Sequence, residues 1–69
     1  MIDTKALKGL IVSKDMTQKD VAQHLKMHPK TFYSKMRKGV FGSDEMEGMI
    51  KLLDIKNPID IFFANEVTS

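Results

Sequence analysis

Apolar side chains recur every three or four residues along most of the chain, and this spacing is typical of amphipathic helices. The first run predicts a helix over residues 4–13, whose buried face carries Leu7, Leu10 and Ile11. Asp3 or Thr4 can cap the start of this helix, because either side chain can accept a hydrogen bond from a free backbone N–H.

Two further runs lie close together and predict a pair of helices joined by a tight turn. The first helix of the pair is expected over residues 18–25, and its apolar face comprises Val21, Ala22 and Leu25. Thr17 is a suitable N-cap, and Asp20 three residues later completes a capping box. Residues 26–28 form the turn, in which Met27 is expected to point into the core.

The second helix of the pair is expected over residues 29–38, because Pro29 suits a first helical position and Gly39 suits a left-handed stop. Phe32 and Met36 are four residues apart and are expected to face the core. The opposite face carries Lys30, Tyr33, Ser34 and Arg37, with Thr31 and Lys38 beside it. This helix therefore presents a basic, hydroxyl-rich surface.

The next stretch predicts a loop and a fourth helix. Val40 and Phe41 in the loop are expected to tuck beneath the preceding helix. Ser43 is expected to cap the fourth helix, in which Gly48 permits a close contact. The buried stripe of that helix comprises Met46, Met49, Ile50 and Leu53.

A last short helix is expected from about residue 59 to residue 64, since Asn57 and Pro58 provide a cap and a first helical position. The whole pattern predicts an all-α fold, a compact bundle of about five short helices in a single domain over residues 1–64, with a frayed tail at residues 65–69. A chain of 69 residues is near the lower limit for a self-supporting core.

Residues 17–39 resemble the helix-turn-helix of the Cro/repressor family of temperate phages, through TQKDVAQHLKM followed by HPKTFYSKMRKG. They resemble more narrowly the small phage-type regulators whose second helix reads T-F/L-x-x-K-M/L-x-x-G. The matching residues are Thr17, Gln18, Val21, Ala22, Leu25, Met27, Thr31, Phe32, Lys35, Met36 and Gly39. The resemblance extends over residues 4–64. It implies a lambda-repressor-like DNA-binding fold in a transcriptional regulator that binds a palindromic operator as a dimer.

Two positions depart from the family pattern. Lys26 occupies the turn position that usually holds Gly, and a left-handed backbone there costs a lysine roughly 1 kcal/mol. His28 replaces the usual Ser before the second helix, so that helix is expected to be less well capped.

The composition of the chain excludes several kinds of functional site. The chain has no cysteine, which excludes a disulfide scaffold, a thiolate metal site and a cysteine nucleophile. It has no apolar run of about 20 residues and no signal-peptide-like start, so we expect a cytoplasmic protein without membrane contact. The predicted turn separates His24 from His28, so no metal site is expected. A helical domain of this size offers no deep cleft, so we expect neither an enzyme nor a cofactor.

The net charge of +2 is unevenly distributed. Residues 21–43 contain four lysines, Arg37 and no acidic residue, a net charge of +5. Residues 44–69 contain two lysines and six acidic residues, a net charge of −4. A basic segment followed by an acidic one predicts a positive face, as in nucleic-acid-binding proteins.

We expect the second helix of the pair to lie in the major groove of a double-stranded DNA operator. Lys30 and Arg37 can donate hydrogen bonds to guanine. Ser34 can donate or accept, and Tyr33 can contact a thymine methyl group or a phosphate. The resemblance implies that Gln18 lies at the DNA backbone. The expected DNA-contacting residues are Gln18, Lys19, His28, Pro29, Lys30, Thr31, Tyr33, Ser34, Arg37 and Lys38.

Two alternatives remain open at this point. The chain can instead be an antirepressor or modulator that binds another phage repressor protein, and salt dependence would distinguish the two functions. In the apolar tail, Ile61, Phe62 and Phe63 either close the underside of the core or form a contact with a second subunit or a partner protein.

Overall fold

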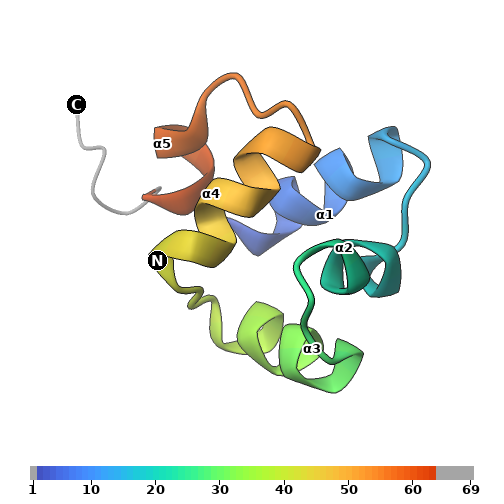
Figure 1. The fold of residues 1–69 in the computed structure, drawn as a ribbon. Coiled ribbons are helices and arrows are strands. Elements are labelled where there is room, and N and C mark those ends of the chain that lie inside the picture. Colours follow the sequence, from blue (N-terminus) through green and yellow to red (C-terminus); the bar gives the residue numbers. More distant parts are fainter. Residues whose placement is uncertain (1, 64–69) are drawn as a thin grey trace.

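Five helices follow one another in residues 2–63, the part of the chain that the computed structural model describes, and no strand occurs there. They are α1 (Thr4–Ser13), α2 (Gln18–His24), α3 (Pro29–Lys38), α4 (Ser43–Leu52) and α5 (Pro58–Phe62). They form one compact all-helical domain (Figure 1), which confirms the all-α prediction for these residues. Ala64 and the expected tail at 65–69 lie outside the described residues. None of the helices within residues 2–63 combines the length and apolar character needed to cross a lipid bilayer.

All five helices contribute to one hydrophobic core, because each has an apolar face at helical spacing. The buried side chains are Ile2, Leu7, Ile11, Val21, Ala22, Phe32, Met36, Phe41, Met49, Leu53, Ile55 and Phe62. Phe32 of α3 packs on Phe41 of the next loop, with ring centroids 5.3 Å apart and ring planes tilted by 52°. The inner face of α3 is thereby fixed to the body of the domain.

The starts of α1 and α2 are capped as the sequence predicts. The Asp3 carboxylate accepts a hydrogen bond from the Ala6 N–H at 3.1 Å. In α2 the Thr17 hydroxyl accepts from the Asp20 N–H at 3.1 Å, and the Asp20 carboxylate accepts from the Thr17 N–H at 2.9 Å. Hydrogen bonds with Thr17 lower the pKa of Asp20 below its ordinary value. The bond with the Thr17 backbone has the larger effect and the bond with its side chain the smaller one. This reciprocal pair fixes the residue at which α2 begins.

The turn between α2 and α3 places Lys26 in the left-handed region, with φ of 57°. The Met27 N–H donates to the Ala22 carbonyl at 2.9 Å, and the half-buried Met27 side chain packs against the core as predicted. After α3, Gly39 ends the helix with φ of 71°, which is also the predicted left-handed stop. The helix pair therefore has the turn geometry expected from its sequence.

His28 itself caps α3, although the replacement of the usual Ser was expected to leave this helix less well capped. Its Nδ1 accepts a hydrogen bond from the Lys30 N–H at 3.1 Å. Pro29 at the first helical position has no N–H that would need a partner. An imidazole nitrogen thus replaces the serine hydroxyl as the acceptor at this helix start.

Two expectations for the next segment are wrong. Phe41 is buried as predicted, but Val40 is 64% exposed, because the chain leaves α3 at Gly39 with only one of the two side chains directed inward. Ser43 is the first residue of α4 rather than its cap. Gly42 holds the N-cap position, and its N–H donates to the Glu45 carboxylate at 2.7 Å.

Gly48 allows α4 to approach the end of α2, as the sequence suggests. A Cβ atom at position 48 would lie 2.6 Å from the Leu25 Cδ2 atom, which is closer than side-chain packing permits. The small residue therefore sets how closely α4 packs beside the half-buried Leu25.

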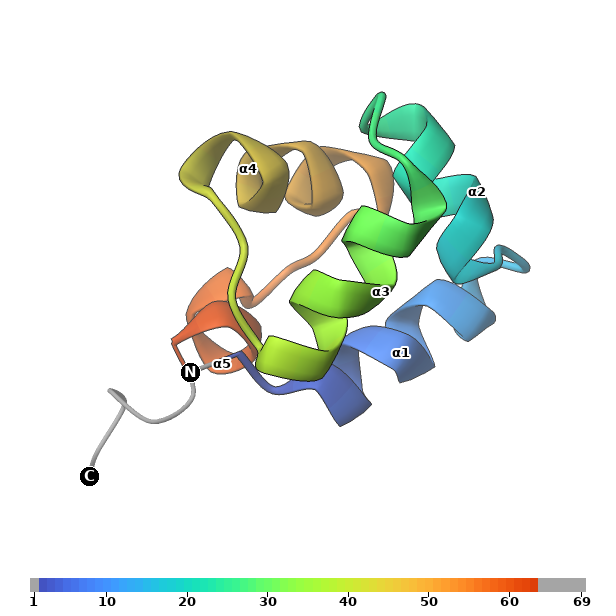
Figure 2. The same ribbon diagram turned by 90° about the horizontal axis from the view of Figure 1, so that it is seen from below.

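The segment before α1 joins both α5 and the end of α3. The Asp3 N–H donates to the Ile61 carbonyl at 2.7 Å, and the Ile2 N–H donates to the Gly39 carbonyl at 3.4 Å. Figures 1 and 2 both show the start of the chain beside α5 and the loop after α3. These contacts hold the carboxyl end of α3, while its amino end points away from them.

Candidate nucleic-acid interface

Helix α3 lies at the edge of the domain, at the bottom of Figure 1 and across the centre of Figure 2. It covers ten residues, or about 15 Å of helix. Phe32 and Met36 on its inner face are buried, which confirms their predicted role. The helix therefore has one face in the core and the other at the molecular surface.

None of the α3 residues predicted to contact DNA is buried. Pro29 and Ser34 are half-buried, and Tyr33 is 42% exposed. The remaining predicted residues of α3 are exposed, namely Lys30, Thr31, Arg37 and Lys38. Positions 30, 33, 34 and 37 recur at helical spacing, so they form one strip along the outer face.

The cations of the outer face of α3 differ from Lys35 of the same helix in their pairing. Lys30, Arg37 and Lys38 form no ion pair with an acidic residue within residues 2–63. Lys35 on the same helix pairs with Glu45 of α4, and its side chain is only partly exposed. The positive charge of the outer face is consequently not neutralised by the described residues, whereas that of Lys35 is.

The other predicted contact residues flank this strip in sequence. Gln18 and Lys19 are in the first turn of α2, where Gln18 is half-buried and Lys19 is exposed. His28 is exposed and immediately precedes α3. Its capping role was not predicted, although a histidine two residues before a helical N–H carries a suitable acceptor in its side chain.

The three tail residues of the predicted subunit or partner contact do not share one environment. Phe62 is buried in the core and is not available at the surface of this domain. Ile61 is half-buried, and Phe63 is 41% exposed. Ile59, which was not singled out from the sequence, is 60% exposed. Phe63 also lines a shallow hollow of about 210 Å³ together with Val40.

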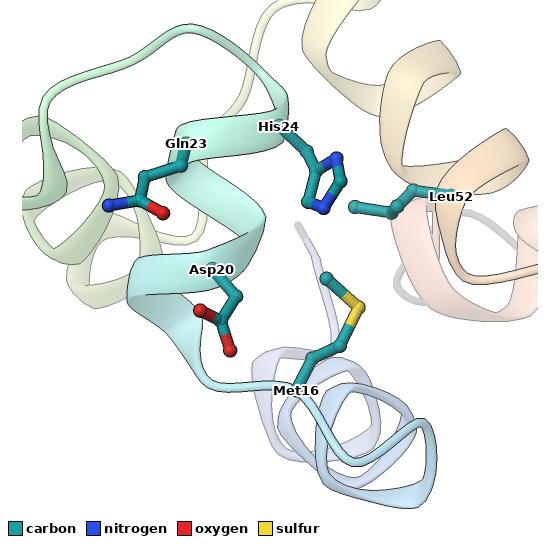
Figure 3. A pocket seen from close by; sticks show the side chains of 5 residues that line it. All are labelled: Met16, Asp20, Gln23, His24 and Leu52. Carbon is teal, nitrogen blue, oxygen red and sulfur yellow. The ribbon is translucent and has the colours of Figure 1, made fainter.

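Another hollow lies away from α3, between α2 and the end of α4 (Figure 3). It measures about 480 Å³ and is lined by Met16, Asp20, Gln23, His24 and Leu52. Figure 3 shows His24 and Leu52 directed toward each other, with Met16 below them. The Asp20 carboxylate already accepts the Thr17 N–H, and residues 2–63 contain no cluster of three or more His, Cys, Asp or Glu side chains able to hold a metal ion. Figure 3 shows the Gln23 side chain directed away from His24 and Leu52.

Comparisons with known proteins give no match, neither to a protein-family model nor to a curated protein nor to a solved structure.

Proposed function

We propose that this chain is a sequence-specific DNA-binding transcriptional regulator of the Cro/repressor type, with a lambda-repressor-like helix-turn-helix formed by α2 and α3. The observation that carries the proposal is the outer face of α3, where Lys30, Tyr33 and Arg37 are exposed on a helix whose opposite face is buried. A rigid helix with free cations on one face fits the width and the negative potential of the DNA major groove.

In this mechanism α3 enters the major groove and its side chains read base edges. Lys30 and Arg37 donate to guanine O6 or N7, and the Ser34 hydroxyl donates to or accepts from a neighbouring base. The Tyr33 ring contacts a thymine methyl group, while its hydroxyl reaches a phosphate. Because Phe32 fixes the helix to the core, these side chains arrive with a fixed register.

The flanking residues position the domain on the DNA backbone. Gln18 and Lys19 in the first turn of α2 contact one phosphate strand, and Thr31 and Lys38 contact the other side of the groove. Such contacts add affinity without sequence preference, and they make binding sensitive to salt.

A two-fold dimer on a palindromic operator would place two copies of α3 in successive major grooves. The exposed Ile59 and Phe63 are the apolar side chains of the α5 region that a second copy can cover. A protein-directed role, as an antirepressor or modulator that binds another repressor, is the second candidate. It is favoured by the exposed Val40 and Phe63, which border one hollow.

A mobility-shift assay with DNA flanking the chain's own gene tests the proposal, with a partner repressor present or absent. A protein that neutralises two phosphates with lysines, as proposed for Lys19 and Lys38, loses about 12-fold in affinity between about 50 and 200 mM salt. Affinity for DNA that falls in this way supports the proposal. A salt-insensitive complex with the partner repressor, formed without DNA, would instead establish the protein-directed function.

A further inference from the structure

The capping hydrogen bond of α3 determines which nitrogen of His28 carries a proton. Nδ1 accepts from the Lys30 N–H at 3.1 Å, so Nδ1 must present a lone pair. A neutral imidazole has one protonated and one unprotonated nitrogen, so its proton is on Nε2. The fold thereby selects one of the two neutral tautomers.

The same contact determines where the remaining donor points. Nδ1 and Nε2 lie on different edges of the ring, so a ring whose Nδ1 faces the helix backbone directs its Nε2–H away from it. The His28 side chain is exposed, so this donor faces the surroundings of α3 rather than the core. Rotating the ring to redirect Nε2–H would break the cap, which costs about as much as losing any N-cap side chain.

Two of the first three residues of α3 have no free backbone N–H. Pro29 has no N–H, and the N–H of Lys30 is occupied by His28. The N–H of Phe32 donates to the His28 carbonyl at 3.1 Å. The Nε2–H group of His28 therefore adds a directed donor to those that Lys30 and Thr31 supply at this helix end.

We propose that neutral His28 is a positioning and contact residue for DNA. Its Nδ1 caps α3, and its Nε2–H donates a hydrogen bond to an acceptor atom of the duplex at the edge of the groove. This inference rests on the proposed DNA-binding function. It differs from a contact through a protonated, charged histidine, because an imidazolium has no acceptor at Nδ1 and cannot cap the helix.

Methylation of Nε2 separates the donor role from the capping role. The 69-residue chain is short enough for chemical synthesis with a methylated histidine at position 28. A methyl group on Nε2 keeps the cap and removes the donor, whereas a methyl group on Nδ1 removes both, because the neutral ring then has no N–H. The binding probe is the duplex that the unmodified chain selects from a randomised pool. We expect Nε2-methylation to weaken binding about tenfold or more with unchanged thermal stability. Nδ1-methylation should lower the melting temperature.

Two further measurements identify the contact. The ring ¹⁵N shifts of the free protein should show an unprotonated Nδ1 and a protonated Nε2, and the opposite tautomer would overturn the inference. Uncharged methylphosphonate linkages and 7-deazaguanine, introduced one position at a time, then distinguish a phosphate acceptor from a base acceptor. When the DNA modification is at the contacted position, the chain with native His28 and the Nε2-methylated chain should bind that duplex equally weakly.

The failures of the two proposals are distinguishable. If the unmodified chain selects no duplex, the proposed function fails and this inference fails with it. If a duplex is selected and the Nε2-methylated chain binds it as tightly as the unmodified chain, only the role of His28 is overturned.

Discussion

The ammonium group of Lys35 lies 2.6 Å from the carboxylate of Glu45, and this ion pair joins α3 to the first turn of α4. The same carboxylate accepts the Gly42 N–H at 2.7 Å. Partial burial raises the pKa of Glu45, but the hydrogen bonds from Lys35 and Gly42, with the charge of Lys35, outweigh burial and leave the pKa below its ordinary value. One side chain therefore starts α4 and holds α3 in place.

Glu45→Gln should lower the free energy of unfolding by about 0.5–1 kcal/mol, because it removes the charge pair from a partly exposed site while its amide oxygen still accepts the Gly42 N–H. Urea denaturation measures this change. Glu47→Gln is the matched control, since Glu47 forms a more exposed pair with Lys51 at 3.4 Å. Equal losses of unfolding free energy in the two variants would show that the Lys35–Glu45 pair stabilises the domain no more than the exposed Lys51–Glu47 pair.

Acid should destabilise the domain through the carboxylates of Glu45 and Asp20. The folded-state pKa values of Glu45 and Asp20 are lowered, so the unfolded chain binds more protons than the folded one as pH falls. Their contribution is fully present above the ordinary pKa values of 4.5 and 3.8, and it is lost as pH falls through the lower folded values. Urea denaturation over a pH series should show this loss. The loss should be smaller in Glu45→Gln, and a pH profile that is the same in both proteins would contradict this assignment.

Two glycines in helices allow a direct test of the contact between α4 and α2. Gly9→Ala in α1 should stabilise the domain by about 0.5–1 kcal/mol, because a Cβ there meets no atom within 4 Å and alanine favours a helix. Gly48→Ala gains the same propensity but forces the Leu25 side chain to move. We expect it to be at least about 1 kcal/mol less stable than Gly9→Ala in thermal denaturation. Identical gains at both positions would refute the close contact.

DNA affinity should depend on the outer face of α3. Lys30→Ala and Arg37→Ala should each weaken operator binding by about 1–3 kcal/mol. They should change the free energy of unfolding by less than about 0.5 kcal/mol, since both side chains are exposed. Lys51→Ala on α4 removes an equal charge and serves as the control in the mobility-shift titration. Unchanged DNA affinity in both α3 variants would show that neither Lys30 nor Arg37 contacts the DNA.

The adjacent phenylalanines of the tail should respond differently to truncation. Phe62→Ala removes a buried ring and should cost about 3–5 kcal/mol, enough to unfold much of a domain this small. Phe63→Ala removes a 41% exposed ring and should cost less than about 1 kcal/mol. Circular dichroism during urea titration compares the two. A large loss from Phe63→Ala at low protein concentration would mean that this ring also belongs to the core.

Much of the helix pair was predictable because its ends are encoded by local chemistry. Thr17 and Asp20 form a reciprocal cap in which both partners are visible in the sequence. Gly39 needs only a left-handed backbone, which glycine adopts without strain. Helical spacing likewise identified Phe32 and Met36 as buried, because one face of a helix must meet the core.

The errors arose where two neighbours compete for one role. Ser43 is a good cap by itself, but a cap at Gly42 puts Glu45 at the third helical position, where its carboxylate reaches back to the Gly42 N–H. A cap at Ser43 would put Met46 there, which has no carboxylate. Val40 was expected inside because it is apolar, yet only one of two adjacent loop side chains can face inward.

The hydrogen bond from the Asp3 N–H to the Ile61 carbonyl also bears on biosynthesis. During translation, α2 and α3 leave the ribosome before α5, and the Asp3 N–H has no acceptor at Ile61 until residue 61 has emerged. We therefore expect the nascent chain to form this hydrogen bond only after α2 and α3 have emerged and residue 61 has followed them.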